Sequence, residues 1–164
     1  MKLALLFLGL AAAYLLIGWF VSFPIRFRSY TLSSPKIKAP VRLAVVSDLH
    51  STVYGPDQKR LLDKLRQSRC DLILMPGDII DDIKPLRGAE LFLDQVSAIA
   101  PCYYCTGNHE NIETLITLPE VKARVRQAGI TVLDNTRETI TIRGTRLTLC
   151  GVDDPRKYAY IDRD

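Results

Sequence analysis

The sequence predicts an α/β fold built on a largely parallel sheet, and three observations lead to this prediction. Four strand-like segments alternate with three helix-like segments between residues 41 and 135, which is the pattern of a parallel sheet that is covered on both faces. An alternating stretch at 136–152 follows and predicts an antiparallel hairpin. Polar residues gather after the first three strands, at the edge where parallel sheets bind ligands.

The first strands and the first helix have clear sequence signals. The β-branched run at 41–48 predicts a strand that ends in Ser-Asp. A Gly-Pro-Asp turn then leads into a helix at 58–68, which carries its leucines on one face. The apolar run at 71–78 predicts a second, buried strand, which ends at a Pro-Gly pair followed at once by aspartates.

The second half of the domain continues the alternation. Residues 86–100 place apolar side chains at helical spacing, and 102–108 predict the third strand. A short helix at 119–129 has proline near its start and glycine at its end. Strand character resumes at 130–135, and the hairpin that follows turns at Arg-Gly.

The composition is that of a globular protein, with 48% hydrophobic and 24% charged residues over 164 positions. This length suits one domain with one appendage. The net charge of +4 comes from lysines and arginines that are scattered along the chain. A basic surface for nucleic acid is therefore not predicted, and we expect no nucleic-acid partner.

The N-terminal segment is the predicted appendage. Leu3 to Phe23 is a run of 21 residues without a charge, and a helix needs about 20 such residues to span a bilayer. A cleaved signal peptide is the alternative, but its apolar region is normally about 7–15 residues long. We therefore predict a transmembrane anchor at 1–23, a linker at 24–40 and a domain at 41–164, in a single-pass protein of the cell membrane. Basic residues flank the run on both sides, so the side that the domain occupies stays open.

The cysteines include one C-x-x-C pair, Cys102 and Cys105, which raises the alternatives of a redox or a zinc site. The pair lies on a predicted strand, where positions three apart point to opposite faces. No second C-x-x-C completes a zinc site. We therefore predict that both are packing residues.

Three polar clusters carry the chemistry. They contain Asp48 and His50 after the first strand, Asp78 after the second, and Asn108 and His109 after the third. Both histidines of the chain fall in these clusters. Carboxylate, imidazole and amide oxygen suit Mn, Fe or Zn, and a cation would allow the acids to crowd together.

The motifs "DLH" at 48–50, "GDIID" at 77–81 and "GNHE" at 107–110, in this order, resemble those of the calcineurin-like metallophosphoesterases. The resemblance runs from about residue 41 to 154, and with the apolar N-terminus it is similar to a bacterial membrane-anchored subgroup. It implies a four-layer α/β/β/α sandwich, of which this chain would hold the N-terminal portion. It also implies two divalent or trivalent metal ions and hydrolysis of a phosphoric ester.

The resemblance also implies roles for single residues. Asp48 and His50 would hold the first metal, Asp78 would bridge both metals, and Asn108 would bind the second. His109 would face the substrate phosphate, and Asp81 would orient His109. Each polar residue also has a structural alternative as a turn or capping residue, and we interpret the remaining acids as structural or solvated: Asp82, Glu110, Asp153 and Asp154.

One part of the family pattern is missing. The family's site also uses a later histidine and a G-H-x-H pair, and no histidine follows His109 here. Two explanations stay open: the chain is a fragment of a longer protein, or it is a short form that has lost catalysis. In either case we do not expect these 164 residues alone to be fully active.

We therefore predict a membrane-anchored enzyme that hydrolyses a phosphodiester or pyrophosphate bond at two metal ions. The substrate would be a phosphoester, lipid-linked or derived from a nucleotide. The alternative from another class is a non-catalytic binding or scaffold protein with the same fold. A soluble nuclease is a second alternative, against which the uncharged N-terminal run and the lack of a basic groove argue.

Overall fold

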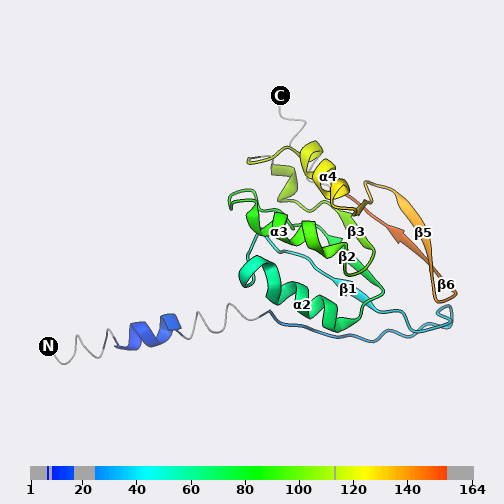
Figure 1. The fold of residues 1–164 in the computed structure, drawn as a ribbon, viewed down its shortest axis with the longest axis horizontal. Coiled ribbons are helices and arrows are strands. Elements are labelled where there is room, and N and C mark those ends of the chain that lie inside the picture. Colours follow the sequence, from blue (N-terminus) through cyan, green and yellow to red (C-terminus); the bar gives the residue numbers. More distant parts are fainter. Residues whose placement is uncertain (1–6, 8, 17–24, 113, 155–164) are drawn as a thin grey trace. The chain divides into compact units, whose positions relative to one another are not determined.

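The computed structural model describes residues 7, 9–16, 25–112 and 114–154. It divides into two compact units, Met1–Tyr30 and Thr31–Asp164 (Figure 1). In the first unit, residues 9–16 are helical and exposed. The anchor expected at 1–23 lies largely outside the described residues. Among the residues that the structure describes, no helix has the length and apolar character needed to cross a bilayer.

The second unit is built on a four-stranded sheet. Its strands are β1 (Leu43–Val45), β2 (Leu72–Pro76), β3 (Cys102–Cys105) and β4 (Thr131–Val132), which lie side by side in that order. Every neighbouring pair is parallel. The predicted α/β fold with a parallel sheet is confirmed, although β1 and β4 are shorter than the sequence pattern indicates. Parallel pairing in this order brings the carboxyl ends of β1, β2 and β3 to one edge.

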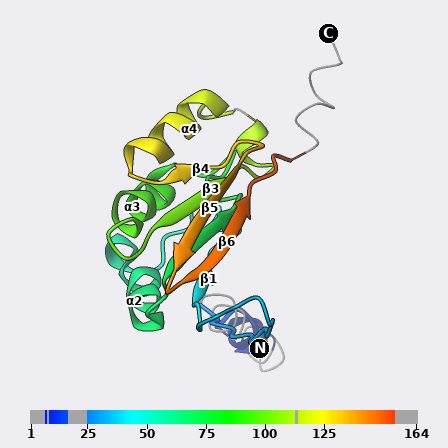
Figure 2. The ribbon, with the colours of Figure 1, turned by 90° about the vertical axis from the view of Figure 1, so that its right-hand side faces the viewer.

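Three helices cover one face of this sheet (Figure 2). They are α2 (Lys59–Ser68), α3 (Arg87–Val96) and α4 (Leu118–Gln127). Each turns its apolar face inward, and the residues buried from α2 and α3 are mainly leucine, phenylalanine, alanine and valine. A fully buried side chain of this size stabilises the fold by about 1.5–3 kcal/mol. Two single-turn 3₁₀ helices complete this layer: η1 (Pro56–Gln58) and η2 (Glu110–Ile112).

The antiparallel hairpin lies against the opposite face of the sheet. Its strands are β5 (Arg137–Ile142) and β6 (Thr145–Cys150). Leu72, Tyr103 and Leu133 form a buried cluster on that face, and side chains of the hairpin pack against it. The layers are therefore helices, parallel sheet and hairpin.

The segment expected as a linker makes contacts at its C-terminal end. The backbone N–H groups of Lys38 and Ala39 donate to the hydroxyl of Thr145, at 3.1 Å and 3.3 Å. The side chain of Arg143 donates to the carbonyl of Pro40 at 2.8 Å. The last residues before the domain are therefore attached to the hairpin turn.

The loop after β1 is held against helix α3. A Cβ added to Gly88 would lie 1.8 Å from the carbonyl oxygen of Ser51, so the helix approaches the loop at a distance that only glycine allows. The amide of Gln58 is fully buried and donates to the carbonyls of Thr52 and Gly88, at 2.6 Å and 2.8 Å. These contacts give the segment that follows Asp48 and His50 a defined position.

The four cysteines are free thiols, and all of them lie in the described part of the chain. Cys102 is buried and Cys105 is half-buried. Burial raises the pKa of the Cys102 thiol to about 12, with the nearby Cys70 adding to the shift. A neutral thiol is a poor nucleophile and a poor metal ligand, which agrees with the prediction that the C-x-x-C pair serves packing.

Candidate metal site

Three loops meet at the carboxyl edge of the sheet, one after each of β1, β2 and β3. Backbone hydrogen bonds connect the first two. The N–H of His50 donates to the carbonyl of Asp78 at 2.9 Å, and the N–H of Ser51 donates to the carbonyl of Ile79 at 3.0 Å. The predicted clusters at these strand ends are therefore brought together in space.

The backbone of these loops adopts conformations that are rare for residues other than glycine. The φ angles are +56° at Asp48, +45° at His50 and +55° at Asp78. Each such residue costs about 1–3 kcal/mol, and such residues cluster at functional sites. Three of the predicted metal ligands therefore lie at strained backbone positions.

Two glycines allow the loops after β2 and β3 to touch. A Cβ added to Gly77 would lie 2.3 Å from the backbone nitrogen of Gly107, and one added to Gly107 would lie 2.3 Å from a carboxylate oxygen of Asp78. Larger residues would push the loops apart. The glycines of the "GD" and "GNH" motifs thus bring Asp78 next to the loop that carries Asn108 and His109.

Glu110 joins the loop after β2 to the loop after β3. Its side chain is buried, with 2% exposure, and its carboxylate accepts four backbone hydrogen bonds. The donors are the N–H groups of Asp78, Ile79, Ile80 and Gly107, at distances of 2.8–3.1 Å. This agrees with the structural role that the sequence suggests for Glu110.

We expect Glu110→Gln to lower the free energy of unfolding by about 1–3 kcal/mol, because an amide cannot accept all four hydrogen bonds and leaves a buried N–H unsatisfied. Urea denaturation measures the change. Glu138→Gln is the control, since Glu138 is exposed and its amide oxygen could still accept from Tyr103. Equal effects of the two substitutions would contradict the role of Glu110.

The first group of possible metal ligands is Asp48, His50 and Asp78. Their ligand atoms all lie within 4.8 Å of one another. His50 Nε2 is 4.0 Å from a carboxylate oxygen of Asp48. Among the described residues, no lysine or arginine forms an ion pair with Asp48 or Asp78. The donor set is thus two carboxylates without a lysine or arginine partner and one imidazole next to them. Such a set fits a divalent metal ion.

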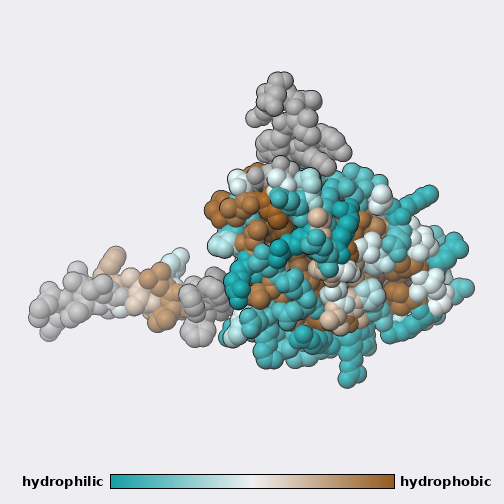
Figure 3. All heavy atoms as spheres, turned by 45° about the horizontal axis from the view of Figure 1, so that its top comes forward, coloured by the Kyte–Doolittle hydropathy of each residue, from teal (hydrophilic) through white to brown (hydrophobic). Residues whose placement is uncertain are grey.

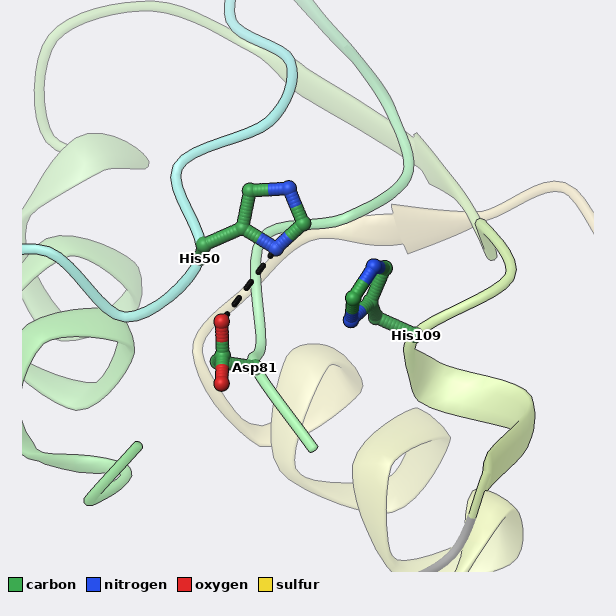
Figure 4. Close-up of side chains that lie close together, drawn as sticks. All are labelled: His50, Asp81 and His109. Atoms are coloured by element: carbon green, nitrogen blue, oxygen red, sulfur yellow. Dashed lines mark ion pairs between the residues drawn. The ribbon is translucent and has the colours of Figure 1, made fainter. Parts of the chain in front are cut away.

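The second group is His50, Asp81 and His109, whose ligand atoms also lie within 4.8 Å of one another. Figure 4 shows that the three side chains converge from three separate loops. The two imidazole rings are in edge-to-face contact, with centroids 4.4 Å apart and an interplanar angle of 80°. His50 belongs to both groups, so the two sets of residues are adjacent.

The partner of His109 differs from the one expected. The resemblance implies that Asp81 orients His109, but the structure places Asp82 in that contact, with 2.6 Å between His109 Nδ1 and Asp82 Oδ1. Asp81 instead faces His50, at 3.4 Å from its Nδ1. The physical reason is that one oxygen of Asp81 accepts from the backbone N–H groups of the two residues after Asp82, which turns the carboxylate toward His50.

The electrostatics of the site follow from these contacts. Burial lowers the pKa of His109, but the hydrogen bond to Asp82 and the charges of neighbouring aspartates more than offset it, so the pKa lies above 6.5. Burial raises the pKa of Asp81, but its two backbone hydrogen bonds and the charges of Lys84 and His50 outweigh burial, so this pKa is lowered. The site therefore favours an ionised Asp81 and retains a proton on His109 to higher pH than an isolated imidazole would.

Asn108 lies between Gly107 and His109, in the turn that leads into η2. The backbone N–H of His109 donates to Asp78 Oδ1 at 3.0 Å, and the carbonyl of Asn108 accepts from the N–H of Asn111 at 3.2 Å. Both chain neighbours of Asn108 thus contact Asp78, which places its backbone at the edge of the first ligand group.

The sequence interpretation missed the contact of Asp82 with His109, because the motif at 77–81 ends at Asp81 and Asp82 lies one residue beyond it. Asp153 lies apart from the ligand groups, as expected. It is buried and accepts a hydrogen bond from the hydroxyl of Thr106 at 2.8 Å. Lys122 lies 3.6 Å from it, so this acid belongs to a structural network.

The fold and the site define an α/β protein with carboxylates and imidazoles gathered at the ligand-binding edge of a parallel sheet. The chain belongs to the calcineurin-like phosphoesterase family, whose model matches residues 41–161. The independent match agrees with the motifs at 48–50, 77–81 and 107–110.

The curated proteins include a relative in Caenorhabditis elegans named "Putative metallophosphoesterase F40B5.2", which is 31% identical over 120 residues. The match covers 70% of this chain and 24% of that protein, so the chain spans about a quarter of its length. Among solved structures, the phosphopantetheinyl hydrolase of Mycobacterium tuberculosis matches with a TM-score of 0.49 and 19% identity. That match covers 67% of this chain and 41% of the other.

Proposed function

We propose that the protein hydrolyses a phosphoric ester, with a phosphodiester or pyrophosphate bond preferred, at a centre of two metal ions. Family membership supports metal-dependent phosphoester hydrolysis. The single observation that carries the proposal is the first ligand group. Asp48, His50 and Asp78 offer ligand atoms within 4.8 Å of one another, at one edge of the sheet.

In this proposal Asp48 and His50 would hold the first ion, Asp78 would be shared by both ions, and Asn108 would contribute its amide oxygen to the second. The donor set is compatible with Mn, Fe or Zn. When bound, such ions would polarise the phosphoryl group and supply a hydroxide nucleophile. The position of Asp78 supports a bridging role, because its backbone and side chain contact both neighbouring loops.

His109 is proposed to face the substrate phosphate and to donate a proton to the leaving oxygen. Its side chain is 30% exposed, so a substrate could reach the ring. The contact with Asp82 holds the Nδ1 side and leaves Nε2 for the substrate. A positioned acid of this kind contributes about 10²–10⁴-fold to the rate.

The surroundings of the site support a substrate with an apolar part. Large apolar side chains are exposed on the loops after β1, β2 and β3: Val53, Ile83, Ile112 and Leu115. The hydroxyl of Thr114 donates to the carbonyl of Asp82, which joins two of these loops. Figure 3 shows hydrophobic side chains gathered at the upper left of the globular part, the side on which Figure 1 places the loops before α3 and α4. A lipid-linked phosphoester is therefore favoured over a nucleotide-derived one.

We also propose that the protein is attached to the cell membrane by a single span at its N-terminus. The 21 uncharged residues from Leu3 to Phe23 support this proposal. For the whole protein we propose a four-layer α/β/β/α sandwich, in which the helices, the parallel sheet and the hairpin described above belong to three of the four layers.

The test begins with metal binding by the 164-residue chain in detergent. After treatment with a chelator, we expect Mn²⁺ or Zn²⁺ to bind and to raise the melting temperature, because a ligand that binds only the folded state stabilises it. The protein as made from its natural gene is then assayed on bis(p-nitrophenyl) phosphate and on the corresponding monoester. We expect metal-dependent hydrolysis of the diester, faster than that of the monoester.

Two results would argue against the proposal. Failure of both ions to bind the chain would remove the metal site. Metal binding by the chain together with no hydrolysis by the natural protein, on generic or lipid-linked diesters, would favour the non-catalytic scaffold instead.

A further inference from the structure

The adjacent residues Asp81 and Asp82 face different histidines. Asp82 Oδ1 is 2.6 Å from Nδ1 of His109, and Asp81 Oδ2 is 3.4 Å from Nδ1 of His50. Both carboxylates are largely buried, with side-chain exposures of 9% for Asp81 and 12% for Asp82. Each histidine of the chain therefore has its own carboxylate on the Nδ1 side.

The position of Asp81 is set by its own loop. Its Oδ1 accepts from the backbone N–H groups of Ile83 and Lys84, at 2.9 Å and 2.7 Å. Its backbone N–H donates to the hydroxyl of Ser51 at 3.1 Å. Oδ2 is thereby left facing His50, and Lys84 Nζ lies 3.7 Å from it.

One ring nitrogen of His50 is available to the Asp81 carboxylate. Its Nδ1 is buried and has no hydrogen-bond partner among the residues that the structure describes, and Asp81 is the acid that faces it. Its Nε2 points to the other side, 4.0 Å from Asp48. A carboxylate on one nitrogen of an imidazole whose other nitrogen binds a metal is the arrangement that fixes the ring orientation and tautomer of metal-bound histidines.

Asp82 is held by the loop that follows β3 rather than by its own. Its carbonyl accepts from the hydroxyl of Thr114, and its carboxylate contacts His109. A movement of that loop would therefore carry Asp82 and His109 together.

We propose that the two aspartates have separate positioning roles: Asp81 orients the metal ligand His50, and Asp82 orients His109. This inference rests on the proposed function for the roles of the two histidines. In each pair the carboxylate faces Nδ1: it is in hydrogen-bond contact at His109 and 3.4 Å away at His50, whose Nδ1 would donate to Asp81 once Nε2 holds a metal. Nε2 is thus left for the metal at His50 and for the substrate at His109.

The test uses the metal-free chain and needs no activity. With two histidines in the sequence, a His50→Gln variant alone assigns the ring ¹⁵N signals, and Asp81→Asn and Asp82→Asn are then compared with the unsubstituted chain. We expect Asp82→Asn to shift the signals of His109 more than those of His50, and Asp81→Asn to shift those of His50 more than those of His109. The reverse pattern, in which Asp81→Asn shifts mainly the signals of His109, would overturn the proposal.

A second measurement covers the case in which a variant does not fold. In the unsubstituted chain we expect both rings to carry a proton on Nδ1, with the Nδ1 proton of His109 far downfield because of its short contact with a carboxylate. A proton on Nε2 and none on Nδ1 of His50, at a pH where the ring is neutral, would overturn the assignment of Asp81.

The natural protein supplies the functional arm. We expect Asp81→Asn to weaken metal binding by about 10–100-fold, with kcat restored at saturating metal. We expect Asp82→Asn to leave metal affinity unchanged and to lower kcat by at least about 10-fold.

Asp63→Asn is the control. Asp63 forms ion pairs with two residues of its own helix, α2, and its replacement should change neither metal affinity nor kcat. If each aspartate substitution shifts the signals of its own histidine as expected but the natural protein shows no hydrolysis, the proposed function fails while the geometry stands. Equal loss of metal affinity in both variants would overturn the division of roles.

Discussion

Replacing Asp78 by asparagine is expected to abolish stable metal binding and, with it, hydrolysis. An amide has one neutral oxygen donor where the carboxylate offers two charged ones, so it cannot bridge two cations. The loss of affinity should exceed the 10–100-fold that a change outside the direct ligands typically costs. Metal content after dialysis and titration calorimetry on the 164-residue chain measure binding, and diester hydrolysis by the natural protein measures activity.

The fold should tolerate this change, since the amide oxygen can still accept from the backbone N–H of His109. Asp71→Asn is the matched control, because Asp71 precedes β2 while Asp78 follows it. Asp71 accepts from the backbone N–H of Arg42, at the opposite end of the same strand. Metal loading that is unchanged in the Asp78 variant, or equally reduced in both variants, would count against the bridging role.

Replacing His109 by glutamine is expected to leave metal binding intact and to lower kcat by about 10²–10⁴-fold, the usual contribution of a positioned acid. The effect should depend on the leaving group. A nitrophenolate leaves without protonation, so a nitrophenyl ester should lose less than an alkyl ester. Steady-state kinetics on the two diesters, at saturating metal, measure the difference.

His50→Gln is the comparison for this experiment, because the structure puts His50 in both ligand groups. The His50→Gln substitution should therefore lower the affinity for the metal. A His109 variant that loses metal as readily as the His50 variant would show that His109 is a ligand rather than an acid. Equal loss on both leaving groups would argue that His109 stabilises charge and does not deliver a proton.

Much of the fold could be predicted because its local signals are strong. The leucines of 58–68 have the helical periodicity, and the apolar run around Ile73 is short and ends at a Pro-Gly turn, as strands do. The structure contains α2 and β2 there. Strand lengths were less predictable. Residues after Val45 have a strand-like composition, but the backbone at Asp48 turns to a positive φ, which is set by the neighbouring loop.

The candidate site was predictable as a set of residues and less so as a set of contacts. Parallel strands in sequential order carry their ends to one edge, so the convergence of the three motifs follows from the order of the elements. The partner of His109 does not follow in this way. The motif at 77–81 singles out Asp81, but the direction of each carboxylate depends on where nearby N–H groups and the Thr114 loop lie.

The sequence by itself determined the α/β class, the identity of the polar clusters and their place at strand ends, because periodicity and motif order are local properties. The tertiary structure alone decided which carboxylate meets which imidazole and that Glu110 joins two loops by accepting four backbone hydrogen bonds. It also decided that the hairpin, rather than a helix, covers the second face of the sheet. The physical reason is that nearly all of these contacts join residues 27 or more positions apart in the chain, and their geometry depends on the packing of the elements between them.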